Sequence, residues 1–138
     1  MNDTSEWDVW TDETTNVINW PSLGSYNVNF TKYNIIYQGV FDGNHKTIRG
    51  LYRKNPGYDN QGGLIGYIGR SGALKNLTIE KSYVTACAVF AGFNNGSVTN
   101  CTAGRLRTKY CGHGGAVFVY KNYGIMDACV NTADVEWI

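Results

Sequence analysis

The sequence has little of what marks several common classes of protein. It contains no run of about 18 apolar residues, the length that a membrane-spanning helix needs, so we expect no transmembrane helix. The first residues do not show the basic and then apolar pattern of a secretion signal, so export cannot be read from them. Only two histidines are present and no Cys-x-x-Cys pair occurs. We therefore expect no zinc site and no other cofactor.

Charge and proline are also scarce, and helical periodicity is hard to find. Charged residues make up 17% of the 138 residues, and there are 2 prolines against 17 glycines and 10 tyrosines. This mixture is typical of a single domain of strands and turns and argues against disorder. Short runs rich in β-branched and aromatic residues, bounded by Gly and Asn, predict strands at 33–37, 63–68, 77–79, 83–84 and 116–120.

The chain repeats itself. Residues 88–101 align almost without gaps on residues 116–129, and weaker copies occur at 72–77 and 47–51. The apolar anchors of these copies are 26, 24 and 28 residues apart. A period of this length indicates a solenoid, whose coils bury their apolar faces only against neighbouring coils. We predict an all-β fold, a parallel β-helix of four to five coils stacked about 4.8 Å apart.

Equivalent residues of stacked coils should form columns. One inward column is expected to consist of Ile48, Leu74, Val98 and Met126. A second is expected to consist of Leu51, Leu77, Cys101 and Cys129. Asn76 and Asn100 should stack at a corner and exchange amide hydrogen bonds, in a short ladder that ends at Gly50 and Ala128.

Three segments resemble a known family. Residues 63–67, Gly-Leu-Ile-Gly-Tyr, followed by residues 72–77, Gly-Ala-Leu-Lys-Asn-Leu, resemble the GLUG repeat of bacterial surface proteins. Residues 39–52, which contain Phe-Asp-Gly-Asn, resemble the segment that commonly precedes such repeats, and residues 18–24 are similar to its tryptophan-containing lead-in. The resemblance covers about residues 18–130. It implies a right-handed parallel β-helix in an exported or cell-surface protein, and hence an extracellular location.

The four cysteines fall into two pairs at similar repeat positions. Cys101 and Cys129 should lie in adjacent coils with their Cα atoms about 5 Å apart, within the span of a disulfide. Cys87 and Cys111 each follow an anchor by 13 residues, although a four-residue insertion near 112–115 disturbs that register. The sequence leaves open whether each pair is a disulfide or two small apolar side chains in the core.

Charge is distributed unevenly along the chain. Residues 1–13 contain five acidic and no basic residues, whereas all 12 basic residues fall between 32 and 121. We divide the chain into an acidic, tryptophan-rich lead segment, residues 1–24, and the β-helix, residues 25–138. The lead segment is either a solvated tail or attracted to the basic body, within one molecule or between molecules.

The tryptophans suggest a role for the lead segment. Trp7, Trp10 and Trp20 are too apolar for an idle tail. A β-helix has two open ends, so these side chains are expected either to cap one end or to dock on the next molecule in a head-to-tail polymer. Trp137, near the other end of the chain, would complete such a contact.

A basic strand offers a lateral alternative. Arg105, Arg107 and Lys109 alternate with other residues and precede Tyr110, which predicts one basic strand face. That face is either a patch for an anionic glycan or simply solvated, and nucleic acid is not the expected partner.

We therefore expect a non-catalytic structural or interaction module that associates with itself through its ends. The alternative is a module that binds a surface carbohydrate or protein through a lateral face. A polysaccharide-active enzyme comes third, because such enzymes need clustered carboxylates. The carboxylates of the body do not share a repeat position; they are Asp42, Asp59, Glu80 and Asp127. No catalytic residue is assigned.

Overall fold

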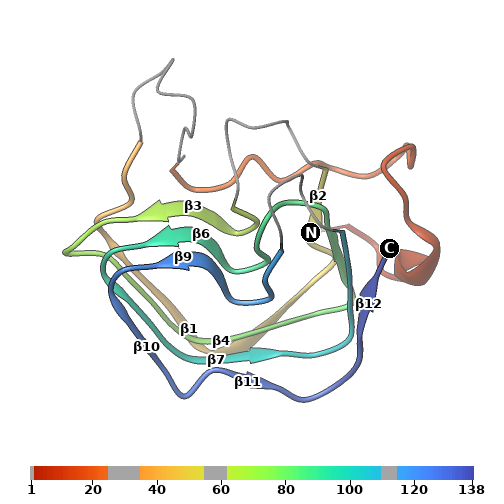
Figure 1. Ribbon diagram of the computed structural model, residues 1–138. Coiled ribbons are helices and arrows are strands. Elements are labelled where there is room, and N and C mark those ends of the chain that lie inside the picture. The colour runs from red at the N-terminus through yellow and green to blue at the C-terminus, as the bar shows by residue number, and fades with distance from the viewer. Residues whose placement is uncertain (1, 25–34, 55–61, 110–114) are drawn as a thin grey trace.

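The chain winds into stacked coils with three walls of parallel strands. The computed structural model describes residues 2–24, 35–54, 62–109 and 115–138 (Figure 1). The five-stranded wall consists of β1 (Val40–Arg49), β4 (Ala73–Glu80), β7 (Ser97–Ala103), β10 (Ile125–Asp127) and β11 (Val130–Asn131). The four-stranded wall consists of β2 (Tyr52–Arg53), β5 (Ser82–Val84), β8 (Leu106–Thr108) and β12 (Val135–Trp137). The three-stranded wall consists of β3 (Ile65–Ile68), β6 (Ala91–Asn94) and β9 (Val119–Asn122).

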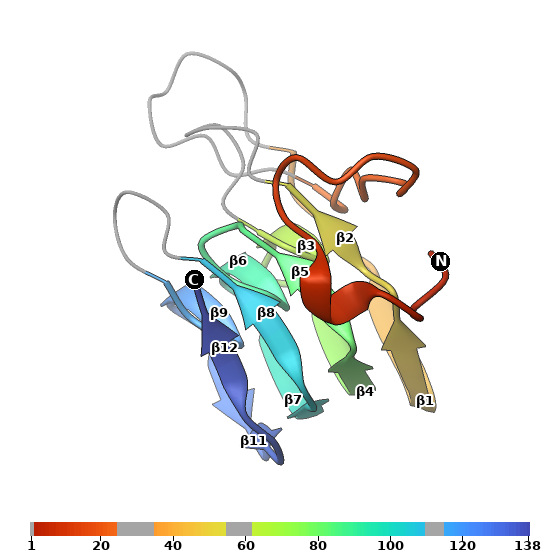
Figure 2. The same ribbon diagram turned by 90° about the vertical axis from the view of Figure 1, so that its right-hand side faces the viewer.

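Every turn of the coil adds one position to each wall. Ala73 pairs with Ser97 and Ser97 pairs with Ile125, so successive positions lie 24 and 28 residues apart. All pairings between the named strands are parallel. Figure 2 shows the coils side by side, from β1 at one end to β11 at the other. The prediction of a parallel β-solenoid is confirmed, with about four coils among the described residues.

The core lies between the three walls. Leu74 and Val98 pair across adjacent coils and are fully buried, and Met126 continues their column, as the repeat predicts. Burying a side chain of this size contributes about 1.5–3 kcal/mol, which no coil obtains without its neighbours. The buried cluster also includes fully buried residues from the other two walls, among them Ile65, Ile68, Val84 and Leu106.

The predicted register is wrong in the first coil. Phe41, and not Ile48, is the partner of Leu74, whereas Ile48 pairs with Ile79. Leu51 is likewise not in the column of Leu77, whose partner in β1 is Lys46. The copy at 47–51 is therefore five residues out of register.

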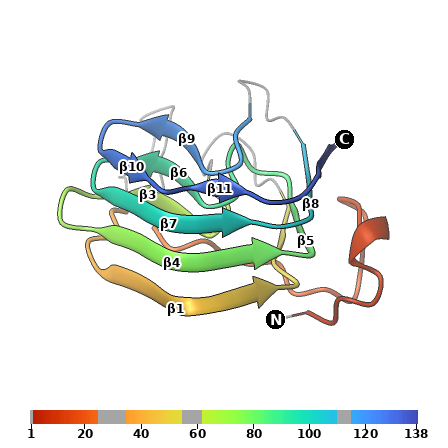
Figure 3. The same ribbon diagram turned by 90° about the horizontal axis from the view of Figure 1, so that it is seen from below.

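β1 also contains a bulge, which changes the separation of paired residues from 33 to 31, still far from the 26 that the repeat predicted. Asp42 faces Lys75 and Lys46 faces Leu77, so residues 43–45 of β1 lie opposite Asn76 alone. Gly43 permits the close approach, because a Cβ atom there would lie 2.5 Å from the carbonyl oxygen of Asn76. Figure 3 shows β1 beside β4 and β7 at this end of the five-stranded wall.

The predicted asparagine ladder is present and has an unexpected end. Asn100 Nδ2 donates to Asn76 Oδ1 at 2.8 Å, and Asn76 Nδ2 donates to Asp42 Oδ1 at 3.1 Å. Asp42, and not Gly50, therefore ends the ladder in the first coil. The backbone N–H of Asn44 and the amide of Asn76 hold the pKa of Asp42 below its ordinary value of 3.8. At the other end Ala128 takes the corner position with φ 52°, close to the 55° and 52° of Asn76 and Asn100.

Replacing Ala128 tests the ladder. Ala128→Asn should raise the free energy of unfolding by about 1–2 kcal/mol, because asparagine tolerates positive φ and its amide can donate to Asn100. Urea unfolding measures the change. Ala128→Gly is the control, since glycine accepts positive φ without adding an amide. If the Ala128→Asn protein is no more stable than this control, an asparagine at position 128 does not extend the ladder.

Candidate functional site

The lead segment lies on the outer side of the four-stranded wall. Trp7 and Trp10 are 7% and 4% exposed and form a second apolar cluster with Tyr52 and Tyr83, separate from the main core. Trp10 meets Tyr52 edge to face at 5.8 Å, and Tyr52 stacks on Tyr83 at 5.4 Å. Figure 2 shows the short 3-10 helix η1 (Trp7–Val9) passing in front of β5. These two tryptophans thus attach the segment to a side of the coil.

This attachment covers part of the basic strand face, since Arg105 and Lys109 stay exposed. The guanidinium of Arg105 lies 5.5 Å from the ring centre of Trp7. Arg107 donates to the carbonyl oxygen of Trp10 and pairs with Glu136 at 3.0 Å. Only 11% of the Arg107 side chain is exposed. Arg105 and Arg107 therefore hold the lead segment, while Tyr110 lies outside the described residues.

One carboxylate connects the acidic segment to the basic body. Asp12 accepts hydrogen bonds from the hydroxyls of Tyr83 and Thr85, both at 3.0 Å, and lies 3.7 Å from the ammonium of Lys109. Burial, and then the bond to Asp12, raise the pKa of Tyr83. At this point, the acidic lead segment thus pairs with the basic body of the same molecule.

Trp20 lies apart from the other two tryptophans, against the first coil of the main core. Its backbone N–H donates to the carbonyl of Tyr52 at 2.8 Å and its indole Nε1 donates to the carbonyl of Leu64 at 3.0 Å. The carbonyl of Trp20 accepts from Arg53, a buried side chain whose Nε has no hydrogen-bond partner. Burial lowers the pKa of this guanidinium.

The last coil exposes apolar side chains and strand edges. Among the described residues, no strand pairs with the outer edges of β9, β10, β11 or β12. Large apolar side chains of this coil are between 38% and 69% exposed, namely Tyr123, Ile125, Met126, Val130, Trp137 and Ile138. At the equivalent positions of the preceding coil, Val98 and Thr108 are buried, whereas Ser97 and Thr102 are half-buried. Sequence reasoning singled out Trp137 here and placed Met126 in an inward column, but it did not single out Tyr123, Ile125 or Val130.

The first coil presents the opposite edge. β1 is the outermost strand of its wall within the described residues, and Val40 is 59% exposed on it. His45 and Lys46 are also exposed on β1. Asp42 is already engaged there by Asn76 and by Lys75, whose ammonium lies 4.0 Å away.

Two cysteines are stacked free thiols. The register of β10 and β11 on β7 places Cys129 next to Cys101, and both are unbridged. Burial raises the pKa of the Cys101 thiol to about 12 and also raises the pKa of Cys129. Cys87 is disulfide-bonded, and Cys111, its predicted neighbour, lies outside the described residues.

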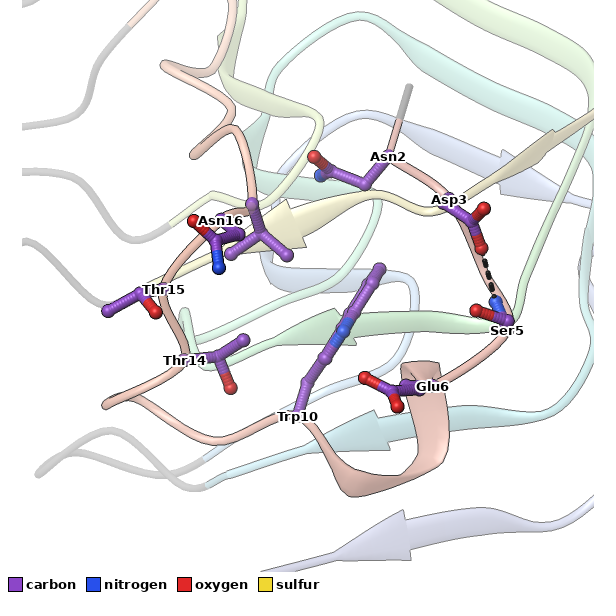
Figure 4. A pocket seen from close by; sticks show the side chains of 9 residues that line it. Asn2, Asp3, Ser5, Glu6, Trp10, Thr14, Thr15 and Asn16 are labelled. Carbon is purple, nitrogen blue, oxygen red and sulfur yellow. Dashed lines mark hydrogen bonds between the residues drawn. The ribbon is translucent and has the colours of Figure 1, made fainter.

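A cup opens on the outward side of the lead segment (Figure 4). Its volume is about 190 Å³, and it is lined by Asn2, Asp3, Ser5, Glu6, Trp10, Thr14, Thr15, Asn16 and Val17. In the part of the chain that the structure describes, no three acidic, histidine or cysteine side chains gather as metal ligands. Nor does any described helix have the length and apolar character needed to cross a membrane.

Neutralising Asp12 tests the attachment of the lead segment. Asp12→Asn should lower the free energy of local opening by about 1–2 kcal/mol, because it removes a charged acceptor from two hydroxyls and an ion pair. Hydrogen exchange at the amides of Val9 and Trp10 measures this opening. Glu13→Gln is the matched control, a neighbouring exposed carboxylate whose side chain makes no hydrogen bond or ion pair among the described residues. Equal exchange in both variants would contradict the role of Asp12.

The thiols can be tested by alkylation. A pKa of about 12 leaves Cys101 almost wholly protonated at pH 8, and thiolate is the reactive form. Iodoacetamide should therefore label Cys101 at least about 100-fold more slowly in the native protein than in urea. Mass spectrometry of the labelled peptides gives the rates. Rapid native labelling of Cys101, or its recovery in a disulfide with Cys129, would refute this assignment.

Comparison with known proteins gives one partial match. No family model matches the chain, and no solved structure matches it. Over 70 residues, 49% of this chain, it is 40% identical to halomucin of Haloquadratum walsbyi. The match covers 1% of halomucin, which is therefore far longer than this chain. The parallel solenoid implied by the GLUG resemblance is present, and membership of the GLUG family itself remains a prediction.

Proposed function

We propose that this chain is a non-catalytic structural module that joins end to end with further copies of itself. The observation that carries the proposal is the last coil, where apolar side chains and strand edges are exposed together. Ile125 is 63% and Val130 51% exposed on strands whose outer edges are unpaired among the described residues. Unpaired edges with apolar neighbours are a template for pairing with another strand.

The first coil of a second copy is a suitable occupant. A copy displaced along the coil axis presents β1 in the same direction as β10 and β11, so it can pair in parallel as β7 does. Exposed Val40 would meet apolar side chains of the last coil. His45 and Lys46 on β1 would approach a coil that exposes Asp127 and Asp134, and opposite charges favour this orientation.

Such a contact joins two different surfaces. A heterologous contact of this kind does not close on itself and produces filaments or an open series of sizes. The lead segment covers only part of the first end. Trp7 and Trp10 attach it to the side of the stack, and Asn19 and Leu23 pair with Tyr52 and Ile65 in the other two walls. The segment leaves the outer edge of β1 open, since that edge has no partner strand among the described residues.

We further propose that the protein is exported and belongs with GLUG-type repeat proteins of the cell surface. The residues 39–52 and 63–77 support the second statement through their resemblance to that family. The partial match to a protein named a mucin supports a place outside the cell.

Lysine substitutions at the two ends test the assembly. The unaltered protein should show a mass that rises with concentration in sedimentation velocity, with filaments by negative-stain microscopy. Ile125→Lys in the last coil and Val40→Lys in β1 should each remove this behaviour, because a buried lysine without a partner opposes association. Val9→Lys is the control, at a residue 66% exposed on the side of the coil. A mass that never changes with concentration would overturn the proposal.

Mixing the two end variants distinguishes the kind of contact. Each variant keeps one intact end, and the intact ends are complementary. An equimolar mixture of Ile125→Lys and Val40→Lys should therefore form heterodimers and nothing larger. Homodimers of Val40→Lys alone would instead show that last coils pair with each other, and would refute the head-to-tail arrangement.

A further inference from the structure

The cup on the side of the molecule has a lining of unusual chemistry. It lies between two limbs of the lead segment, residues 2–6 and 14–17, and holds about 190 Å³. Trp10 stands between them, with the carboxylate of Glu6 on one side and the carboxamide of Asn16 on the other (Figure 4). The end-on contact proposed above does not use this surface.

The limbs of the cup are held in place by their own hydrogen bonds. Asn2 Oδ1 accepts from the N–H of Ile18 at 2.6 Å, and its Nδ2 donates to the carbonyls of Ile18 and Gly50, both at 3.0 Å. At the far side Thr14 Oγ1 accepts from the N–H of Thr11 at 2.7 Å. A site built before its ligand arrives loses less ordering entropy on binding.

Several polar groups of the lining are already occupied. Asn2 and Thr14 make the bonds just described, and Asp3 Oδ1 accepts from the N–H of Ser5 at 2.8 Å. In contrast, the side chains of Glu6, Thr15 and Asn16 have no hydrogen-bond or ionic partner among the described residues. These three supply a charged acceptor, a hydroxyl and a carboxamide from two facing limbs.

The lining selects against charged anions. Two carboxylates line the cup, and no Lys, Arg or His does. Phosphates, sulfates and acidic sugars would therefore be repelled. An ammonium ion would use the carboxylates, but it would leave the amide and hydroxyl donors without an acceptor.

A neutral sugar can bond to all the free polar groups of the lining. Each sugar hydroxyl both donates and accepts, so it can bond to a carboxylate, a hydroxyl and a carboxamide in turn. The methyl groups of half-buried Val17 offer apolar contact to the C–H groups of the ring, whereas Trp10 is 4% exposed and contributes little surface. We propose that the cup binds one unit of a neutral sugar, as part of a glycan chain whose remainder lies in solvent.

Titration of the full-length chain with sugars tests the proposal. The probes are methyl glycosides of glucose, galactose, mannose and N-acetylglucosamine, with glucuronic acid and choline as charged comparisons. Amide shifts of residues 2–6 and 14–17 and tryptophan fluorescence report binding. At least one neutral glycoside should shift these amides with saturation, and neither charged probe should. Saturable binding of choline alone, or of no probe at up to about 100 mM, would overturn the proposal.

Two variants locate the sugar. Glu6→Gln and Asn16→Gly should each weaken binding about tenfold, since the first replaces a charged acceptor by a neutral carboxamide and the second removes a carboxamide. Glycine suits position 16 because Asn16 has φ 62°. Asp8→Asn is the matched control, an exposed carboxylate of the same segment that does not line the cup. Equal affinity in all four proteins would place the sugar elsewhere and refute the assignment. Repeating the titration with Ile125→Lys shows whether the cup works independently of end-on association.

Discussion

The structure depends on backbone pairing between successive coils in a fixed parallel register. Because each strand lies directly on its equivalent in the next coil, side chains of one kind meet their own kind. Leu74 packs on Val98, Asn76 bonds to Asn100, and Tyr67 stacks on Phe93 with ring centres 4.4 Å apart. The sequence repeats because equivalent positions of successive coils must carry side chains that pack or bond with each other. A polar residue at a buried corner is stable only when the neighbouring coil supplies its partner, as Asn122 does for Asn94 at 2.7 Å.

The same requirement explains the two ends. A coil in the middle of the stack has neighbours on both sides, whereas an end coil has unpaired N–H and C=O groups on one edge. In the first coil, Trp20 covers part of the core and Asp42 gives Asn76 a final acceptor. In the last coil, Ala128 offers Asn100 no amide, and Ile125 and Met126 stay exposed. The ends thus differ in their side chains and also in their backbone, since β1 is bulged and Asn19 and Leu23 pair with the first coil.

Sequence reasoning predicted the architecture and the later coils because the copies at 88–101 and 116–129 align without insertions. It failed in the first coil because residues 47–51 imitate the anchor pattern, whereas β1 and β4 pair residues that are 31 to 33 apart in the sequence. The asparagine ladder was visible from Asn76 and Asn100, but Asp42 was not expected to be part of it. The contact that covers Arg107 could not be predicted from the sequence, because its partner Trp10 is 97 residues away and no repeat relates the two. The cup was missed for the same reason, since its limbs meet only through Asn2 and Ile18.

The position of the lead segment adds stability to the stack and leaves the outer edge of β1 unpaired among the described residues. A short stack gains stability from any added apolar burial, and Trp7 and Trp10 supply it. Placed across an end, they would have blocked strand pairing there. On the outer face of β5 and β8, the two tryptophans bury the same surface. Asp12 of the lead segment bonds to Tyr83 of the wall, and Arg107 of the wall bonds to Trp10. The cup lies on the other side of this segment, so a lateral site can coexist with the open last coil and the open edge of β1.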